Sequence, residues 1–317
     1  MPDGLRSPCA ALTNEKLAGG RVLVTGAAGM LGSQLLLDAP GSCMAVGTDL
    51  GSALDGSPEV EFVGVDLTDE SAVVDLFARE RFTGVIHAAA YTAVDKAEEE
   101  SQLARAVNSR APEIVAEACR AAQIPMVLVS TDFIFNGKKG APYLEDDPVA
   151  PLSVYGETKL EGEERARIGH PDGLSVVRTQ WLYGPRGNHF PGTMLRLAKT
   201  NKLLNVVDDQ RGAPTSTLEL SPALWDVLAL GARDQSGVYH ASCEGDGTWF
   251  DFARATFDLG GLDPARVSPC STAEFPRPAV RPTESVLDCS RLTALRTGPM
   301  LTWKQALARF FTLHMSS

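Results

Sequence analysis

The stretch RVLVTGAAGMLG, residues 21–32, combines a short β-branched run with three glycines in a GxxGxxG pattern. The run reads as a strand, and a helix is expected to open after the second glycine. Glycines at such a turn let backbone N–H groups approach a pyrophosphate closely, and the helix N-terminus favours an anion. The pattern predicts a dinucleotide site, with a plain tight turn as the alternative. The cofactor-binding residues predicted in this stretch are Gly26, Gly29, Met30, Leu31 and Gly32.

Strand-like and helix-like segments alternate through the first half of the chain. The strand-like segments are residues 21–26, 43–50, 61–67, 84–90 and 124–135, and the helix-like segments are 30–38, 69–82 and 101–122. Apolar strands that alternate with helices indicate a parallel sheet covered on both faces. The sequence therefore predicts an α/β fold, a Rossmann-type doubly wound parallel sheet, which forms a dinucleotide-binding domain over residues 19–185.

The second half of the chain is less regular. Residues 175–184 look like another strand of the sheet, and helices at 218–231 and 300–313 lie among loops rich in Pro and Gly. We expect residues 186–317 to form mainly a smaller, mixed substrate-binding domain, with some of the chain crossing back to the sheet. Residues 1–18 lack a continuous apolar core, so they are expected to form a flexible leader rather than a signal peptide.

Composition and charge narrow the classes of partner. The formal net charge is −11 and there is no basic stripe, which argues against nucleic acid, because phosphate binding needs clustered Lys and Arg. No apolar run approaches the ~20 residues of a membrane helix, so no membrane contact is expected. The six cysteines are scattered without CxxC spacing, which predicts a reducing cytoplasm and no disulfide framework or zinc site. No metal site is assigned, and the acidic run 95–101 reads as a solvated helix start.

Two aspartates, Asp49 and Asp66, lie at the ends of the next two strand-like segments after the glycines. Asp49 lies about twenty residues beyond them, where a carboxylate accepts hydrogen bonds from the adenosine ribose hydroxyls. It would also repel a 2′-phosphate, and no Arg or Lys follows closely, so Asp49 favours NADH over NADPH. A turn cap is the alternative for Asp49. Asp66 is expected either to meet the adenine edge or to cap the following helix.

The fourth strand-like segment runs into HAAAYT, residues 87–92. Its small side chains let a flat ligand lie against the strand end, although close sheet packing explains the alanines equally well. His87 reads as a core histidine rather than a catalytic one. The remaining cofactor-binding residues predicted along these strand ends are Leu67, Ala89, Ala90 and Tyr91.

The stretch VYGETKL, residues 154–160, supplies a candidate proton donor. Tyr155 and Lys159 share one face of a helix, and a fixed ammonium favours the phenolate, so Tyr155 is expected to lose its proton more easily. Thr131 ends the fifth strand, where open α/β sheets bind ligands, and its hydroxyl can donate to a substrate carbonyl or form a turn. Thr131, Tyr155 and Lys159 together predict hydride transfer to a ketone, with Tyr155 as the general acid and Lys159 also binding the nicotinamide ribose.

Several longer segments resemble the dTDP-4-dehydrorhamnose reductase family of extended short-chain dehydrogenases/reductases. They are AAAYTAVDKAE (88–98), VN with AP (107–112), STDFIFNG (130–137), PYLEDDPVAPLSVYGETKLEGE (142–163), VRTQWLYGP (177–185), DDQRGAPT (208–215) and RPTESVLD (281–288). The resemblance implies reduction of the 4-keto group of dTDP-4-dehydro-L-rhamnose by NADH or NADPH. It also implies Tyr155 as the proton donor, Lys159 as its helper, and it allows for a homodimer.

The resemblance also assigns substrate contacts. It implies that Thr131 and Asp132 contact the sugar, that Trp181 stacks on it, and that Arg211 meets the pyrophosphate. An ordinary core tryptophan is the alternative for Trp181. Phe133 stands where the family more often has Tyr, which keeps open a reductase of another dTDP-4-keto-6-deoxysugar. A third reading is a non-catalytic dinucleotide-binding regulatory subunit, since the β subunit of methionine adenosyltransferase resembles the same family.

Overall fold

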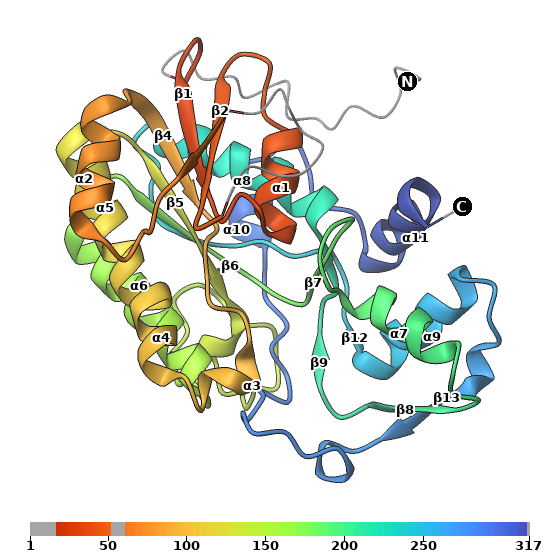
Figure 1. Ribbon diagram of the computed structural model, residues 1–317. Coiled ribbons are helices and arrows are strands. Elements are labelled where there is room, and N and C mark those ends of the chain that lie inside the picture. The colour runs from red at the N-terminus through yellow and green to blue at the C-terminus, as the bar shows by residue number, and fades with distance from the viewer. Residues whose placement is uncertain (1–16, 52–60, 316–317) are drawn as a thin grey trace.

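The structure, a computed structural model, describes residues 17–51 and 61–315. Within these ranges seven parallel strands form the central sheet, in the order β3-β2-β1-β4-β5-β6-β11 (Figure 1). Their bounds are β1 Arg21–Thr25, β2 Met44–Asp49, β3 Glu61–Gly64, β4 Phe82–His87, β5 Met126–Thr131, β6 Leu174–Thr179 and β11 Val238–His240. The predicted doubly wound sheet is confirmed. Its strand order reverses between β1 and β4, which opens a crevice at their carboxyl ends.

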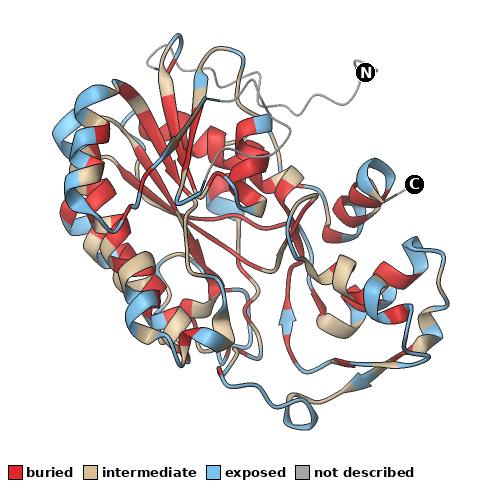
Figure 2. Ribbon diagram, viewed as in Figure 1, coloured by how far each residue is buried: buried red, intermediate tan, exposed pale blue. Residues whose placement is uncertain are grey.

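Helices cover both faces of the sheet because side chains alternate along each strand. In β1, Leu23 packs in one core and its neighbours Val22 and Val24 pack in the other, as a period of two requires. One face is covered by α2 (Glu70–Arg79), α5 (Ala111–Ala122) and α6 (Val154–Gly169), and the other by α1 (Met30–Leu37) and α8 (Thr217–Gly231), with α11 (Trp303–His314) beside α8. Figure 2 shows the buried strands enclosed between these layers.

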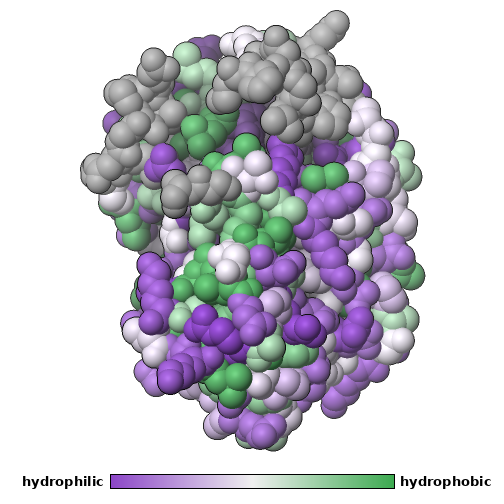
Figure 3. All heavy atoms as spheres, turned by 90° about the vertical axis from the view of Figure 1, so that its right-hand side faces the viewer, coloured by the Kyte–Doolittle hydropathy of each residue, from purple (hydrophilic) through white to green (hydrophobic). Residues whose placement is uncertain are grey.

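The smaller part of the molecule has its own core. Its elements are α7 (Phe190–Ala198), β8 (Leu204–Val207), α9 (Trp249–Leu259) and β13 (Val267–Cys270), and β8 pairs with β13 in parallel. Met194, Ala253, Phe257 and Val267 are buried together between them. The outer side carries exposed leucines, and Figure 3 shows apolar and hydrophilic side chains intermixed on this face. This core stabilises the smaller part, and Phe190 and Trp249 pack against both it and the core beside α8.

The chain returns from the smaller part to the sheet. α8 is buried along almost its whole length against the sheet, and β11 pairs with β6. A single boundary after residue 185 therefore does not separate the two parts. Leu17 is buried in the core beside α8, so the leader predicted for residues 1–18 does not include it. The rest of that predicted leader, residues 1–16, lies outside the described residues.

Shorter elements complete the chain. They are α3 (Val94–Ala97), α4 (Ser101–Arg105), a π-helical turn (Ala106–Arg110), β7 (Leu182–Tyr183), β9 (Arg211–Gly212), β10 (Thr215–Ser216), β12 (Gly247–Thr248) and α10 (Ser290–Thr293). The helix predicted over 101–122 is continuous, with the π-helical turn in its middle. The wide turn directs the buried Asn108 side chain at the backbone of Tyr91, with an N–H to Oδ1 distance of 2.8 Å. Turns of this kind occur often at functional sites.

Helix α6 packs against the π-helical turn at a position that has no room for a side chain. A Cβ added to Gly162 would lie 2.0 Å from the backbone oxygen of Asn108. The absence of a side chain here therefore sets the distance between α6 and the helices beside it, and α6 carries Tyr155 and Lys159.

We expect Gly162→Ala to lower the free energy of unfolding by about 1–3 kcal/mol, because the methyl group forces two backbones apart. Chemical denaturation of both proteins measures this difference. Gly41→Ala is the matched control, since a Cβ there would meet no atom within 4 Å. Equal stability of the Gly162→Ala variant and the unchanged protein would contradict the packing described.

Candidate active site

A cavity of about 660 Å³ lies at the carboxyl ends of the strands, where the two parts of the molecule meet. Most residues that the sequence assigns to a site line it. They are Gly26, Gly29, Met30, Leu31, Gly32, Asp49, Asp66, Leu67, Ala89, Ala90, Thr131, Asp132, Tyr155, Lys159 and Trp181. Tyr91 and Arg211 lie outside its wall. The cavity therefore brings the predicted cofactor, catalytic and sugar-binding residues to one place, with these two exceptions.

The glycine-rich turn leaves a cradle at one end of this cavity. Gly26 has φ of +64°, and a Cβ on it would lie 2.7 Å from the backbone of Ala89. A Cβ on Gly32 would lie 2.1 Å from the oxygen of Gly26. Gly29 is the N-cap of α1 and has no side chain to cap the helix. The first backbone N–H groups of α1 therefore face this end of the cavity without a side-chain acceptor. These residues fit a dinucleotide pyrophosphate, which needs close backbone approach and a helix N-terminus.

Asp49 and Asp66 both accept hydrogen bonds from nearby groups while lining the cavity. Asp49 accepts from the backbone N–H of Ala28 at 3.1 Å and of Leu50 at 2.8 Å. It therefore ties the glycine-rich turn to the end of β2, and carboxylate oxygens have further lone pairs for a ligand. Asp66 accepts from the N–H of Thr68 at 2.9 Å. The cap of α2 is Asp69, so the interpretation of Asp66 as that cap was wrong.

Tyr155 lies near the start of α6, and its ring meets the edge of Phe133 with centroids 5.4 Å apart. Burial raises the pKa of Tyr155 to about 12. The sequence predicted the opposite direction, on the assumption that Lys159 acts on the phenol. Lys159 instead donates to the backbone oxygen of Val129 at 2.7 Å. The phenol therefore stays protonated at neutral pH, which suits a group that donates a proton.

Lys159 is itself deeply buried. Burial lowers its pKa to about 8, and the carboxylate of Glu163 opposes that shift. Glu163, 1% exposed, receives hydrogen bonds from Ser130 and from Arg178, whose terminal nitrogen lies 2.8 Å from Oε2. Sequence reasoning missed Glu163 and Arg178, although Glu163 follows Lys159 by four residues on the same helix and so had a visible spacing signal.

Thr131 and Asp132 form a buried pair at the end of β5. The Thr131 hydroxyl donates to Asp132 Oδ1 at 3.1 Å and accepts from the N–H of Phe133 at 3.2 Å. Ser285 donates to Asp132 Oδ2 at 2.5 Å. Burial raises the pKa of Asp132 to about 6. The single Thr131 proton therefore points at Asp132, and the predicted donation to a substrate carbonyl would require the hydroxyl to turn.

Trp181 forms an aromatic wall with a residue that the sequence did not single out. Its ring stacks on Trp249 with centroids 3.8 Å apart and an angle of 11° between planes, and both rings line the cavity. Trp181 has φ of +48°, an uncommon backbone conformation for a non-glycine residue. Gly212 lies against the same ring, where a Cβ would approach to 2.7 Å. The paired rings give a flat apolar surface in the cavity wall.

The two residues outside the cavity wall have partners elsewhere. The Tyr91 hydroxyl bonds to Glu100, and Arg211 pairs with Asp246. His87 is fully buried and bonds through Nδ1 to Thr25 at 3.1 Å, as the core interpretation predicts.

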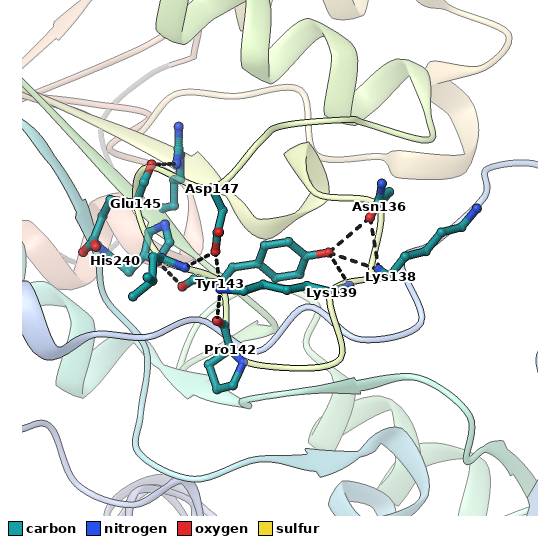
Figure 4. A network of polar contacts seen from close by, with 10 residues as sticks. Asn136, Lys138, Lys139, Pro142, Tyr143, Glu145, Asp147 and His240 are labelled. Atoms are coloured by element: carbon teal, nitrogen blue, oxygen red, sulfur yellow. Dashed lines mark hydrogen bonds and ion pairs between the residues drawn. The ribbon is translucent and has the colours of Figure 1, made fainter.

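Hydrogen bonds join the loop that follows β5 to β11. Tyr143 makes contacts at both ends of this loop (Figure 4). Its phenol oxygen accepts from the N–H of Lys138 at 3.1 Å, and its backbone oxygen lies 3.0 Å from Nδ1 of His240. Glu145 accepts from the N–H of His240 at 3.1 Å. These contacts join residues far apart in the sequence. They fix the loop that begins with Asp132 at the cavity and ends at the edge of the sheet.

Comparison with known proteins places this arrangement in context. A family model described as the RmlD substrate binding domain matches residues 20–315. The dTDP-4-dehydrorhamnose reductase of Streptomyces griseus is 43% identical over 295 residues, which cover 92% of this chain and 93% of that protein. A protein of Streptomyces niveus named dTDP-4-keto-6-deoxy-D-glucose reductase is 36% identical over 297 residues, covering 92% and 97%.

A solved structure shares the fold. The dTDP-4-dehydrorhamnose reductase of Bacillus anthracis in complex with NADP has a TM-score of 0.82 to this structure at 33% identity. The match covers 93% of this chain and 99% of that one. Within the described ranges, no helix is both long and apolar enough to cross a membrane.

The buried ammonium of Lys159 predicts an unusual dependence of stability on pH. Its pKa is about 8 in the folded chain, whereas an unfolded lysine titrates near pH ~10.4. Between these values only the unfolded chain holds the proton, so raising the pH stabilises the folded chain. We expect the free energy of unfolding to rise, relative to Lys159→Met, by about 1 kcal/mol per pH unit from about pH 8 to 10.

Denaturant titrations at several pH values measure this slope. Lys202→Met serves as the control, because Lys202 is exposed and should give the same slope as the unchanged protein. A Lys159→Met variant that followed the unchanged protein at every pH would show that the ammonium is not buried as described.

Proposed function

The chain belongs to the RmlD substrate binding domain family, and we propose that it reduces the 4-keto group of dTDP-4-dehydro-L-rhamnose to dTDP-L-rhamnose. The observation that carries this proposal is the protonated phenol of Tyr155 together with the buried Lys159 in a cavity that begins at a glycine-rich turn. Such a cavity suits an oxidoreductase, in which a dinucleotide and a carbonyl substrate meet at the strand ends.

The residues at the glycine end suit a nicotinamide dinucleotide, which supplies the hydride when bound. Gly26, Gly29 and Gly32 leave room for its pyrophosphate, and the start of α1 favours the negative charge. Asp49 is placed to accept from the ribose hydroxyls at the adenosine end. We expect Lys159, which also lines the cavity, to donate to the nicotinamide ribose with the ammonium protons that the Val129 oxygen does not accept.

The proton comes from Tyr155 in this proposal. Its phenol is protonated at neutral pH and can donate to the carbonyl oxygen as that oxygen gains charge. Because the Lys159 ammonium donates to the Val129 oxygen, we propose that it aids Tyr155 through its positive charge rather than through a direct hydrogen bond. The stacked rings of Trp181 and Trp249 offer an apolar platform for a deoxysugar face, which supports a sugar substrate.

A second ketosugar is the competing substrate. The Streptomyces niveus relative is named for dTDP-4-keto-6-deoxy-D-glucose, and Phe133 meets the Tyr155 ring with no hydroxyl of its own. Turnover of both enzymatically generated ketosugars, followed by oxidation of NADH and NADPH, separates the two substrates. A protein that binds dinucleotide and turns over neither ketosugar would favour the non-catalytic regulatory subunit, which the Tyr155 phenol in the cavity wall argues against.

We propose NADH as the preferred coenzyme. Residues 50–60, which follow Asp49, contain no Arg or Lys that could pair with a 2′-phosphate. The Bacillus anthracis relative was solved with NADP, so the preference has to be measured on this chain. Cytoplasmic location and a homodimer also stay predictions.

Asp49→Asn tests this preference. The amide keeps an oxygen for the Leu50 N–H and removes the negative charge, so we expect the ratio of kcat/KM for NADPH to that for NADH to rise by about tenfold. Steady-state kinetics with both coenzymes measure the ratio. An unchanged ratio, or an unchanged protein that already prefers NADPH, would refute the role given to Asp49.

Tyr155→Phe tests the proton donor. We expect kcat to fall by at least ~10²-fold, because the substitution removes the general acid. The affinity for NADH should stay nearly constant, because the contacts to the dinucleotide are retained. Stopped-flow turnover and fluorescence titration measure the two quantities. Tyr239→Phe is the control, since Tyr239 bonds to Gln235 in the core away from the cavity. Near-full turnover by Tyr155→Phe would remove Tyr155 from the mechanism.

A further inference from the structure

Within the described residues, one guanidinium lines the cavity, and it belongs to Arg281. Arg281 lies in the 279–288 segment, which runs from the smaller part past α3 toward α10 (Figure 1). The segment is fastened to the loop after β5, where the Thr283 hydroxyl donates to the oxygen of Gly137 at 2.9 Å. The position of Arg281 is therefore set by contacts on both of its sides.

Asp95 of α3 holds the Arg281 side chain in a two-point ion pair. The distances are 3.0 Å from Nη1 to Oδ1 and 2.9 Å from Nη2 to Oδ2, and the pair keeps the pKa of Asp95 below its usual range. Nη1 also donates to the oxygen of Ala279 at 2.8 Å. These bonds leave Nε–H and one Nη2 proton of Arg281 without a partner among the described residues.

The charge around Asp95 is not balanced. Arg277 lies 4.0 Å from the same carboxylate, so two guanidinium groups share one negative charge. Arg281 reaches the cavity wall, whose other charged lining residues are Lys159 and three aspartates. This end of the cavity therefore attracts an anion, and a guanidinium with free N–H groups matches phosphate oxygens.

The location separates this anion from the pyrophosphate of the dinucleotide. The glycine-rich turn follows β1, whereas Asp95 follows β4 and the Thr283 contact follows β5. The start of α1 and the Arg281 guanidinium, the two places that favour an anion, thus belong to different strand ends of one cavity. A nucleoside-diphosphate sugar brings a second diphosphate into the same cavity, and it needs a partner of its own.

We propose that Arg281 binds the diphosphate of the nucleoside-diphosphate-sugar substrate, with Asp95 orienting the guanidinium. This inference rests on the proposed function and deepens it. The family resemblance implies that Arg211 binds the substrate diphosphate. The present inference assigns that contact to Arg281 instead. Arg211 pairs with Asp246 and lies outside the cavity wall.

Calorimetric titration of the full chain with dTDP, thymidine and NADH tests the assignment. We expect Arg281→Gln to weaken dTDP binding by about tenfold or more, the scale of a lost charge-assisted contact, with thymidine and NADH affinity unchanged. Arg281→Lys keeps the positive charge and loses the two-point hydrogen bonding of the guanidinium, so it should weaken dTDP binding less than Arg281→Gln. Arg254→Gln is the matched control, because Arg254 is exposed on α9.

The outcomes separate this inference from the proposed function. Unchanged dTDP affinity in both Arg281 variants, or a loss in Arg211→Gln instead, overturns the role of Arg281 while the reductase proposal stands. An equal loss for thymidine shows a structural effect and also overturns it. A loss of NADH affinity alone would assign Arg281 to the coenzyme. If the unchanged protein does not bind dTDP at all, both proposals fall.

Discussion

The close approach of Gly26 to the backbone of Ala89 is the constraint on which the rest of the site depends. A side chain at Gly26 would collide with the strand end after β4, and one at Gly32 would collide with Gly26 itself. Because both are absent, α1 starts directly under the crevice and the β1 and β4 ends stay close together. Asp49 then ties the same turn to β2. The cavity exists where it does because the β1 and β4 ends meet without a side chain between them.

The parts of the fold that follow from local pattern could be predicted from sequence. Leu23 and its neighbours reveal a strand buried on both faces, and the glycines reveal where the first helix begins. The pKa of Tyr155 could not be predicted in this way. Helical spacing brings Lys159 near it, but the spacing carries no information about burial or about the Val129 oxygen that receives the ammonium. Arg281 and Asp95 are 186 residues apart, a pairing that no local pattern reveals.

Buried charge is arranged differently on the two sides of the reacting position. Under α6, Lys159, Glu163 and Arg178 form a buried group in which two cations share one carboxylate. Beside it, burial favours a proton on Asp132, and Ser285 and Thr131 both donate to its oxygens. Desolvation acts on Lys159 and Asp132 in opposite directions: it lowers the pKa of the ammonium and raises the pKa of the carboxyl. Substitution of one of them changes the electrostatics of the whole floor of the cavity.

Helix α8 and strand β11 complete the sheet layer only after part of the smaller part has been synthesised, and this order has a consequence on the ribosome. The first six strands of the sheet emerge by residue 179, but the helix that covers their second face ends at residue 231 and the edge strand at residue 240. Until those residues leave the exit tunnel, Val22, Val24 and Ile86 have no α8 to pack against. The nascent chain therefore carries an uncovered apolar sheet face while the smaller part is being made, and that interval is where aggregation and chaperone binding compete with folding.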